Sequence, residues 1–325
     1  MKLGIVGAGS IGCYLGGKLL ASGAHVTLVG RPRVRDELAT HGIVVEDLGV
    51  RTTVPPVEIE TELAAVADCD VIACCVKSGQ TEQVARELAA IIGPTAVVAS
   101  LQNGVHNPDV LRAHLPGRTI LGGIVGFNVR SRGDGVFHRG TSGPVMLDRV
   151  PAAEPLAQAL EHAGIAVELR RDLMRHQWTK LLVNLNNAVS ALSDAPTRQL
   201  LLSPGYRRVI AAITREALAV MRRAGIRPAA LRGVPVRWMP FVLRLPTVIV
   251  RLVTRSQMKV DPDARSSMWE DLARGRPTEV DFLNGEIVRL GDAPLNRRIV
   301  ELVHAAEGHG SPALAADALW SALHA

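Results

Sequence analysis

The sequence predicts an α/β domain followed by an all-helical domain, and two patterns along the chain carry this prediction. Over the first part, short runs rich in β-branched residues alternate with helical runs, as in a parallel sheet wound on both faces. Beyond Leu173, apolar residues recur at helical spacing and strand signals are few. A chain of 325 residues is long enough for two domains, which we place at residues 1–170 and 171–325.

The expected elements of the first domain are strands and helices in alternation. Strands are predicted at Leu3–Val6, His25–Val29, Val71–Val76, Ala96–Leu101, Ile120–Val125 and Val145–Leu147. Helices are predicted at Ile11–Ser22 and Thr81–Ile92, and Gly133-Asp134-Gly135 predicts a hairpin-like turn. In the second domain, helices are predicted at Trp178–Leu192, Gly205–Ala224, Ser266–Ala273, Glu279–Leu290 and Asn296–Glu307.

Composition excludes several classes of protein. The net charge is +6 and the isoelectric point is near 9.5, but the arginines are scattered and aromatic residues make up only 3%. The dense basic stripe and stacking platforms of a nucleic-acid-binding protein are therefore missing. A mild positive field suits an anionic cofactor and an anionic substrate. No stretch reaches the ~18 uncharged apolar residues that a membrane span needs.

The four cysteines predict a reducing compartment. Cys13, Cys69, Cys74 and Cys75 contain no C-x-x-C pair and no set spaced with histidine as metal ligands are. We interpret them as core residues, with no disulfide and no metal site. Met1-Lys2 leads directly into the first strand without a signal peptide, so we expect a cytoplasmic protein.

A glycine-rich loop lies between the first strand and the first helix. Gly7-Ala8-Gly9-Ser10-Ile11-Gly12 is a G-x-G-x-x-G motif in the strand–turn–helix context of a Rossmann domain. Gly7 permits the tight turn, Gly9 lets the backbone approach a pyrophosphate, and Gly12 lets the helix pack close to the strand. The helix N-terminus favours phosphate. We predict a dinucleotide site; the alternative is a glycine turn without a ligand.

The end of the second strand favours NADPH over NADH. An NAD enzyme usually has an acidic residue there for the ribose 2′-hydroxyl. Here Val29-Gly30 leads into Arg31, and no carboxylate precedes Asp36. The planar guanidinium of Arg31 is suited to a 2′-phosphate. The alternative is a solvated surface arginine.

Polar residues also follow two buried strands and mark one helix face. Lys77 and Gln102-Asn103-Gly104 come at the carboxyl ends of parallel strands, where ligands bind in such sheets, although a strand-end lysine and a plain turn are alternatives. Lys180, Asn184 and Asn187 are spaced i, i+4, i+7 on one face of an apolar helix. They are costly to bury unless satisfied, and the alternative is a solvent-facing stripe.

The last block is Ser266-Ser267-Met268, followed by Pro277-Thr278-Glu279-Val280-Asp281. Taken alone, Thr278 reads as a helix cap and Glu279 as a first-turn carboxylate. Together these segments resemble the ketopantoate reductase (2-dehydropantoate 2-reductase) family over most of the chain. The resemblance rests on the glycine motif, Arg31, Lys77, Gln102–Gly104, the K-L-x-x-N block at Lys180–Asn184, and S-S-M…T-E-V-D-F-x-N-G from Ser266 to Gly285.

That resemblance implies a fold, a reaction and a role for each matching residue. The second domain would be of the 6-phosphogluconate dehydrogenase C-terminal type, and the enzyme would reduce ketopantoate to pantoate with NADPH for pantothenate and coenzyme A. Lys180 would be the general acid and Glu279 its catalytic partner, because a ketone that accepts hydride develops negative charge on oxygen. Asn103, Asn184, Asn187 and Ser267 would bind the substrate. Cofactor contacts would come from Gly7, Ala8, Gly9, Ser10, Ile11, Gly12, Arg31, Lys77, Gln80, Asn103 and Glu279.

Two departures from the family pattern leave alternatives open. The family commonly has a second asparagine where this chain has Ala188, and Asn187 is a candidate substitute. A related 2-oxoacid, 3-hydroxyacid or opine-type dehydrogenase is therefore the second hypothesis. An NADP-binding sensor without activity is the third, and the presence of both Lys180 and Glu279 argues against it. The partner is expected to be a small anionic 2-oxoacid, with no nucleic acid or membrane span, and a homodimer on base rates alone.

The second departure is the apolar segment Arg232–Arg255, with Arg237, Arg244 and Arg251 spaced by seven. Pro240 and Pro246 interrupt it, so one continuous helix is not expected. We predict a bent helical hairpin with its arginine heads in water. The alternative is a segment that covers the substrate pocket or builds a dimer contact.

Overall fold

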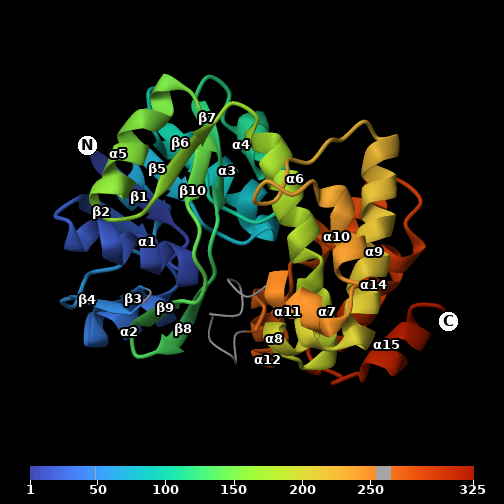
Figure 1. Cartoon of the computed structure of the whole chain (residues 1–325). Helices are drawn as coiled ribbons and strands as arrows, with labels where there is room; N and C mark the ends of the chain where they lie inside the picture. Colours follow the sequence, from blue (N-terminus) through green and yellow to red (C-terminus); the bar gives the residue numbers. More distant parts are fainter. Residues whose placement is uncertain (48, 254–264) are drawn as a thin grey trace. The chain divides into compact units, whose positions relative to one another are not determined.

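The computed structural model describes residues 1–47, 49–253 and 265–325, which form two compact units (Figure 1). The first unit is Met1–Leu173 and the second is Met174–Ala325. The described strands all lie in the first unit, drawn from blue to green, together with five α-helices, whereas the regular elements described in the second, drawn from yellow-green to red, are helices. The observed class is therefore the predicted one, an α/β Rossmann unit followed by a helical unit.

The main sheet of the first unit has seven strands in the order β11-β10-β7-β6-β5-β1-β2. Its strands are β1 Lys2–Val6, β2 His25–Val29, β5 Val71–Cys74, β6 Val97–Ser100, β7 Thr119–Val125, β10 Val145–Asp148 and β11 Val167–Arg170. All neighbouring pairs are parallel except β7 with β10. The six predicted strands are confirmed, and β11 is an addition at the sheet edge.

Both faces of this sheet are covered, which explains the continuous apolar run of β5. Val71 and Ala73 point into the core cluster that includes residues of α1 and α5, whereas Ile72 and Cys74 point into the cluster of α3 and α4. A strand buried on both faces has no polar alternation. The helices of this unit are α1 Ser10–Ala21, α2 Pro32–His41, α3 Thr81–Ile91, α4 Asn107–His114 and α5 Glu154–His162.

A smaller sheet of four strands, in the order β4-β3-β9-β8, was not predicted. Its strands are β3 Ile43–Asp47, β4 Val50–Val54, β8 Val129–Gly133 and β9 Val136–Arg139. Much of β4 and β8 is exposed or half-buried and carries arginines, so the apolar signal is weak. The predicted turn is confirmed: Gly133–Gly135 joins β8 to β9, with Asp134 at φ 49°.

The second unit is built from helices of unequal length. They are α6 Leu173–Asn184, α7 Asn186–Ser193, α8 Thr197–Leu202, α9 Pro204–Arg223, α10 Met239–Val242, α11 Thr247–Val253, α12 Ser267–Ala273, α13 Asn284–Leu290, α14 Pro294–Ala306 and α15 Ala316–Ala322. Among the described residues, no helix is both long and apolar enough to cross a membrane.

Two predicted helices are each divided in the structure. The expected helix 178–192 is α6 and α7 with an irregularity at Leu185, whose N–H still donates to the Leu181 carbonyl at 3.1 Å. The prediction of a single helix over 279–290 is wrong. A 3₁₀ turn at Val280–Phe282 precedes α13, because Leu283 adopts φ −117° and ψ −86°, outside the helical region.

The described part of the apolar segment, residues 232–253, is bent as predicted. Pro240 lies in the first turn of α10 and Pro246 directly precedes α11. The side chains of Arg237, Arg244 and Arg251 are exposed to water, which confirms that part of the prediction. The final two positions, 254 and 255, lie outside the described residues.

Candidate functional site

The glycine loop of the first unit has the geometry that its motif predicts. Gly7 has φ +103°, a conformation that side chains disfavour. A Cβ on Gly12 would lie 2.2 Å from the Gly7 carbonyl oxygen, so α1 can begin only with glycine at this position. A Cβ on Gly9 would meet nothing within 4 Å. Since packing does not require a glycine at Gly9, the open space beside it fits the close approach of a ligand.

Arg31 follows the end of β2, next to this loop. The N–H groups of Gly7 and Ala8 donate to the Val29 carbonyl at 3.0 and 2.9 Å. A Cβ on Gly30 would lie 2.6 Å from the Ala8 Cβ, which shows how closely the two turns approach. The Arg31 side chain is exposed.

Its neighbouring arginines are occupied by carboxylates. Arg33 pairs with Glu37 at 3.0 Å and Arg35 with Asp36 at 2.9 Å. Among the described residues Arg31 forms no such ion pair. Of the three, Arg31 is therefore the arginine whose guanidinium is available to an anion.

The structure also brings together the turns that follow β5 and β6. The Ser78 hydroxyl donates to the Asn103 carbonyl at 2.9 Å, which ties the Lys77 turn to the Asn103 turn. The side chains of Lys77 and Asn103 are half-buried, whereas Gln80 is exposed and its N–H donates to the Lys77 carbonyl at 2.8 Å. These predicted cofactor residues lie at the carboxyl edge of adjacent parallel strands, as expected.

A buried polar network holds these two turns, and the sequence analysis missed most of it. Gln102 donates to the Val76 carbonyl at 3.0 Å and to the Thr81 hydroxyl at 2.7 Å. Thr81 donates in turn to the Asn107 carboxamide oxygen at 2.7 Å, and Asn107 donates to Ser78 at 3.1 Å. Ser78, Thr81 and Asn107 are all buried, and their hydrogen bonds to one another satisfy their polar groups.

Lys180 of α6 has a strongly shifted pKa. Burial lowers its pKa from 10.5 to about 8, and the Glu279 carboxylate opposes that shift. Both side chains are half-buried. The structure therefore places Lys180 and Glu279, the predicted catalytic pair, within electrostatic reach of each other.

The helix that carries Lys180 is fixed by its buried neighbour. The Thr179 hydroxyl donates to the Ala229 carbonyl at 2.7 Å, and the Ala229 N–H donates to the Arg175 carbonyl at 3.0 Å. The Glu279 segment is also braced, because the Thr278 N–H donates to Glu307 at 2.8 Å and Asp281 binds His304 at 3.0 Å. The Thr278 hydroxyl also accepts the Val280 N–H at 3.3 Å, although the N-cap position of the following 3₁₀ turn is Glu279 and not Thr278.

Asn184 and Asn187 are half-buried, at the end of α6 and the start of α7. Ser266 links α7 to α12: its hydroxyl donates to the Asn187 carbonyl at 3.0 Å and accepts the Trp269 N–H at 3.1 Å. Ser267 is exposed in the first turn of α12. The capping function of Ser266 was missed, although a serine before an apolar run is a cap signal.

Ala188, at the position of departure from the family pattern, is completely buried in α7.

The cysteines are buried or half-buried, and burial raises the pKa of each thiol, which makes them poor nucleophiles and metal ligands.

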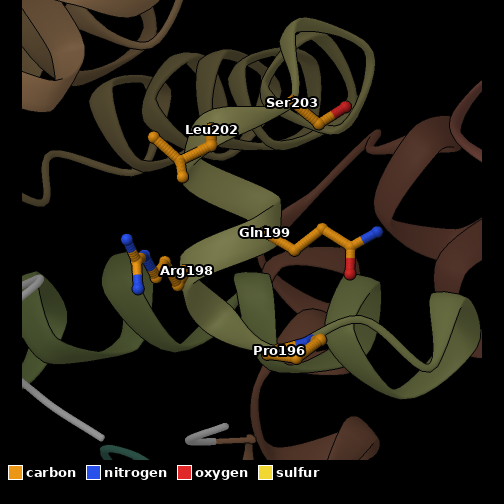
Figure 2. A pocket seen from close by; sticks show the side chains of 5 residues that line it. All are labelled: Pro196, Arg198, Gln199, Leu202 and Ser203. Atoms are coloured by element: carbon orange, nitrogen blue, oxygen red, sulfur yellow. The ribbon is translucent and has the colours of Figure 1, made fainter. Parts of the chain in front are cut away.

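A surface hollow of the second unit lies at α8. It is lined by Pro196, Arg198, Gln199, Leu202 and Ser203 (Figure 2). Arg198 and Gln199 extend from α8 in different directions, so their polar groups do not converge. None of the predicted site residues lines it, and we do not consider it the substrate site.

The similarity of this chain to known reductases identifies it as an oxidoreductase that acts on CH–OH groups. A model of the ketopantoate reductase PanE/ApbA family matches residues 3–152, and the model of its C-terminal domain matches residues 172–307. A 2-dehydropantoate 2-reductase of Halobacterium salinarum is 31% identical over 95% of this chain and 100% of its own. The chain therefore belongs to the ketopantoate reductase family.

Solved structures agree with this family and fold. The PanE/ApbA family ketopantoate reductase of Ralstonia eutropha has a TM-score of 0.80 at 30% identity, covering 94% of this chain and 98% of its own. D-mandelate dehydrogenase with NADH and anilino(oxo)acetate has a TM-score of 0.78 at 23% identity, covering 94% and 98%. The second likeness shows the fold alone.

Proposed function

We propose that the protein reduces 2-dehydropantoate to pantoate with NADPH, a step of pantothenate and coenzyme A biosynthesis. The observation that carries the proposal is the pair of Lys180 and Glu279, because burial lowers the pKa of Lys180 to about 8 while Glu279 opposes the shift. A general acid works best when its pKa lies near the working pH. A lysine that only faces water requires neither a lowered pKa nor a neighbouring carboxylate.

NADPH would be held by the first unit. The open space beside Gly9 fits a pyrophosphate, and the unpaired guanidinium of Arg31 fits a 2′-phosphate. Ala8, Ser10, Ile11 and Gly12 of the loop, together with Lys77, Gln80, Asn103 and Glu279, would complete the cofactor contacts. When bound, NADPH supplies the hydride.

The chain's own residues would bind the 2-oxoacid and supply the proton. The Lys180 ammonium would donate to the keto oxygen, where negative charge develops, and its Nζ would then be neutral until it regains a proton from water. Glu279 would orient Lys180 and the reacting oxygen. Asn103, Asn184, Asn187 and the exposed Ser267 hydroxyl would hold the substrate, whose carboxylate suits hydroxyl and amide donors.

A related 2-oxoacid reductase with another substrate is the second candidate, and the presence of Ala188 where the family commonly has an asparagine favours it. An alanine cannot bind a substrate hydroxyl as an asparagine would. If Ala188 borders the substrate, the enzyme would prefer a 2-oxoacid without the primary hydroxyl. 3-Hydroxyacid and opine-type dehydrogenases are the remaining alternatives within this candidate.

One experiment separates these candidates. Purified protein is mixed with NADPH or NADH and a panel of 2-oxoacids, and nucleotide oxidation is followed in a single turnover. The proposal expects oxidation of NADPH with 2-dehydropantoate. Oxidation with another acid alone would establish the second candidate, and nucleotide binding without any oxidation would indicate a sensor.

The nucleotide preference has its own variant. Arg31→Ala should raise KM for NADPH while leaving KM for NADH nearly unchanged, with Arg35→Ala as the matched control. A wild-type preference for NADH would overturn the choice of NADPH.

The free cysteines suit a reducing compartment, so we also propose that the protein is cytoplasmic. On base rates for oligomers we propose a homodimer, which light scattering would test.

A further inference from the structure

The segment that departs most from the family pattern also concentrates the positive charge of the protein. Residues 227–253 contain five arginines and no carboxylate: Arg227, Arg232, Arg237, Arg244 and Arg251. Removing these five from the 37 Lys and Arg leaves 32 against 31 Asp and Glu in the rest of the chain. Five of the six formal positive charges therefore belong to this 227–253 segment, and all five arginines are exposed.

The same segment exposes large apolar side chains. They are Val234, Trp238, Phe241, Val248, Ile249 and Leu252. On α11, Val250 is fully buried, whereas Val248 is 79% and Leu252 71% exposed. Trp238 and Phe241 contact each other edge to face at 6.1 Å, and the Arg237 guanidinium lies 6.0 Å from the Trp238 ring. These six side chains, exposed within 19 residues of sequence, are called the patch here, and a protein surface in water alone does not require so many.

The patch is firmly attached to the second unit. Arg207 of α9 is buried, and its guanidinium donates to the Leu243 carbonyl at 2.9 Å and to the Leu245 carbonyl at 3.1 Å. It also donates to the Thr247 hydroxyl at 3.1 Å, so one side chain binds the end of α10 and the start of α11. The exposed side chains are thus presented from an anchored backbone.

We propose that the 227–253 segment docks the protein on the surface of an anionic lipid bilayer. Exposed tryptophan, phenylalanine and aliphatic side chains among arginines are the combination that binds the headgroup region of membranes. Anionic headgroups complement the five arginines, each of which adds to the attraction. Four of the six apolar side chains lie on short helices, Phe241 on α10 and Val248, Ile249 and Leu252 on α11, which suits insertion between lipids.

A second copy of this chain fits the patch less well. An isologous contact would place the patch against itself and bring the arginines of both copies together without a carboxylate from either segment. All 31 Asp and Glu lie outside the segment, where 32 Lys and Arg balance them.

The test is sedimentation of the full-length protein with vesicles. The probes are phosphatidylcholine vesicles and vesicles of equal parts phosphatidylcholine and phosphatidylglycerol, each at low and high salt. We expect binding to the phosphatidylglycerol vesicles at low salt and its loss at high salt. Arg244→Gln/Arg251→Gln should lower the partition coefficient between these vesicles and water roughly 30-fold, because each arginine contributes about a factor of five. Val248→Ser/Leu252→Ser should weaken it as well.

Matched controls are Arg35→Gln and Val50→Ser, which change an exposed arginine and an exposed valine of the first unit and should bind like the wild type. Circular dichroism confirms the fold of each variant. The proposal is overturned by an absence of binding to phosphatidylglycerol vesicles, by equal binding to both vesicle types, or by double variants that bind as the wild type does. A concentration-dependent dimer that Val248→Ser/Leu252→Ser disperses, without vesicle binding, would identify a second copy as the occupant instead.

Discussion

The pKa of Lys180 predicts how the reaction rate depends on pH. With a pKa of about 8, Lys180 is roughly 90% protonated at pH 7 and roughly 10% at pH 9, whereas a lysine at 10.5 stays protonated throughout. Because ketone reduction needs the protonated form, kcat/KM should fall about tenfold between pH 7 and 9, in the profile that reports groups of the free enzyme.

Glu279 gives this prediction a sign that can be tested. Its carboxylate raises the pKa of Lys180, so Glu279→Gln should move the midpoint of the decline to lower pH, besides lowering the rate. Lys180→Arg should have little remaining activity and no decline in this range, since arginine does not titrate there. The assay is steady-state reduction of the best 2-oxoacid at subsaturating concentration, from pH 6 to pH 10. A wild-type profile that stays flat to pH 10, or a midpoint that rises in Glu279→Gln, would refute the reasoning.

Three further predictions concern the glycine loop and the second unit. Gly9→Ala should have the stability of the wild type but bind NADPH at least about tenfold more weakly, because its Cβ meets no protein atom. Gly12→Ala should lose about 1–3 kcal/mol of stability, because its Cβ would clash with the Gly7 carbonyl. Thermal melts measure the stability and fluorescence titrations the NADPH affinity. Asn296→Ala should cost about 1–3 kcal/mol in urea unfolding, because fully buried Asn296 donates to Glu216 at 2.7 Å and its removal leaves buried polar groups without partners. Burial alone would lower the pKa of His304, but hydrogen bonds to carboxylates raise it. Its contribution to stability should therefore be present below about pH 6.5 and lost as pH rises through the folded-state pKa. Equal effects of His304→Ala on unfolding at pH 5.5 and 8.5 would contradict this.

The parts of the fold that the sequence predicted are those with one dominant local signal. The run at Val71–Cys74 is apolar on both faces, and the glycine spacing at 7, 9 and 12 specifies a strand, a turn and a helix, so both were found. The four-stranded sheet was missed because β4 has only one buried residue of five. The pairing of β3 with β4 on one side and with β9 on the other is a tertiary fact that no local pattern contains.

The candidate site divides in the same way. Lys180 and Glu279 lie about a hundred residues apart, and their mutual effect could be expected only from the family resemblance. The network of Ser78, Thr81 and Asn107 was invisible because each residue alone reads as a turn or a helix start. Burial distinguishes a polar residue that holds a turn from one that faces water, and burial depends on the complete fold.

The central claim is that the ammonium of Lys180 protonates the keto oxygen. The most direct measurement is single-turnover oxidation of NADPH by wild type and Lys180→Ala at pH 7, with nucleotide affinity measured separately in each. We predict unchanged NADPH affinity and a turnover lower by roughly two to four orders of magnitude, the usual scale for a general acid. A turnover near that of the wild type, with the variant folded and NADPH bound, would contradict the assigned role.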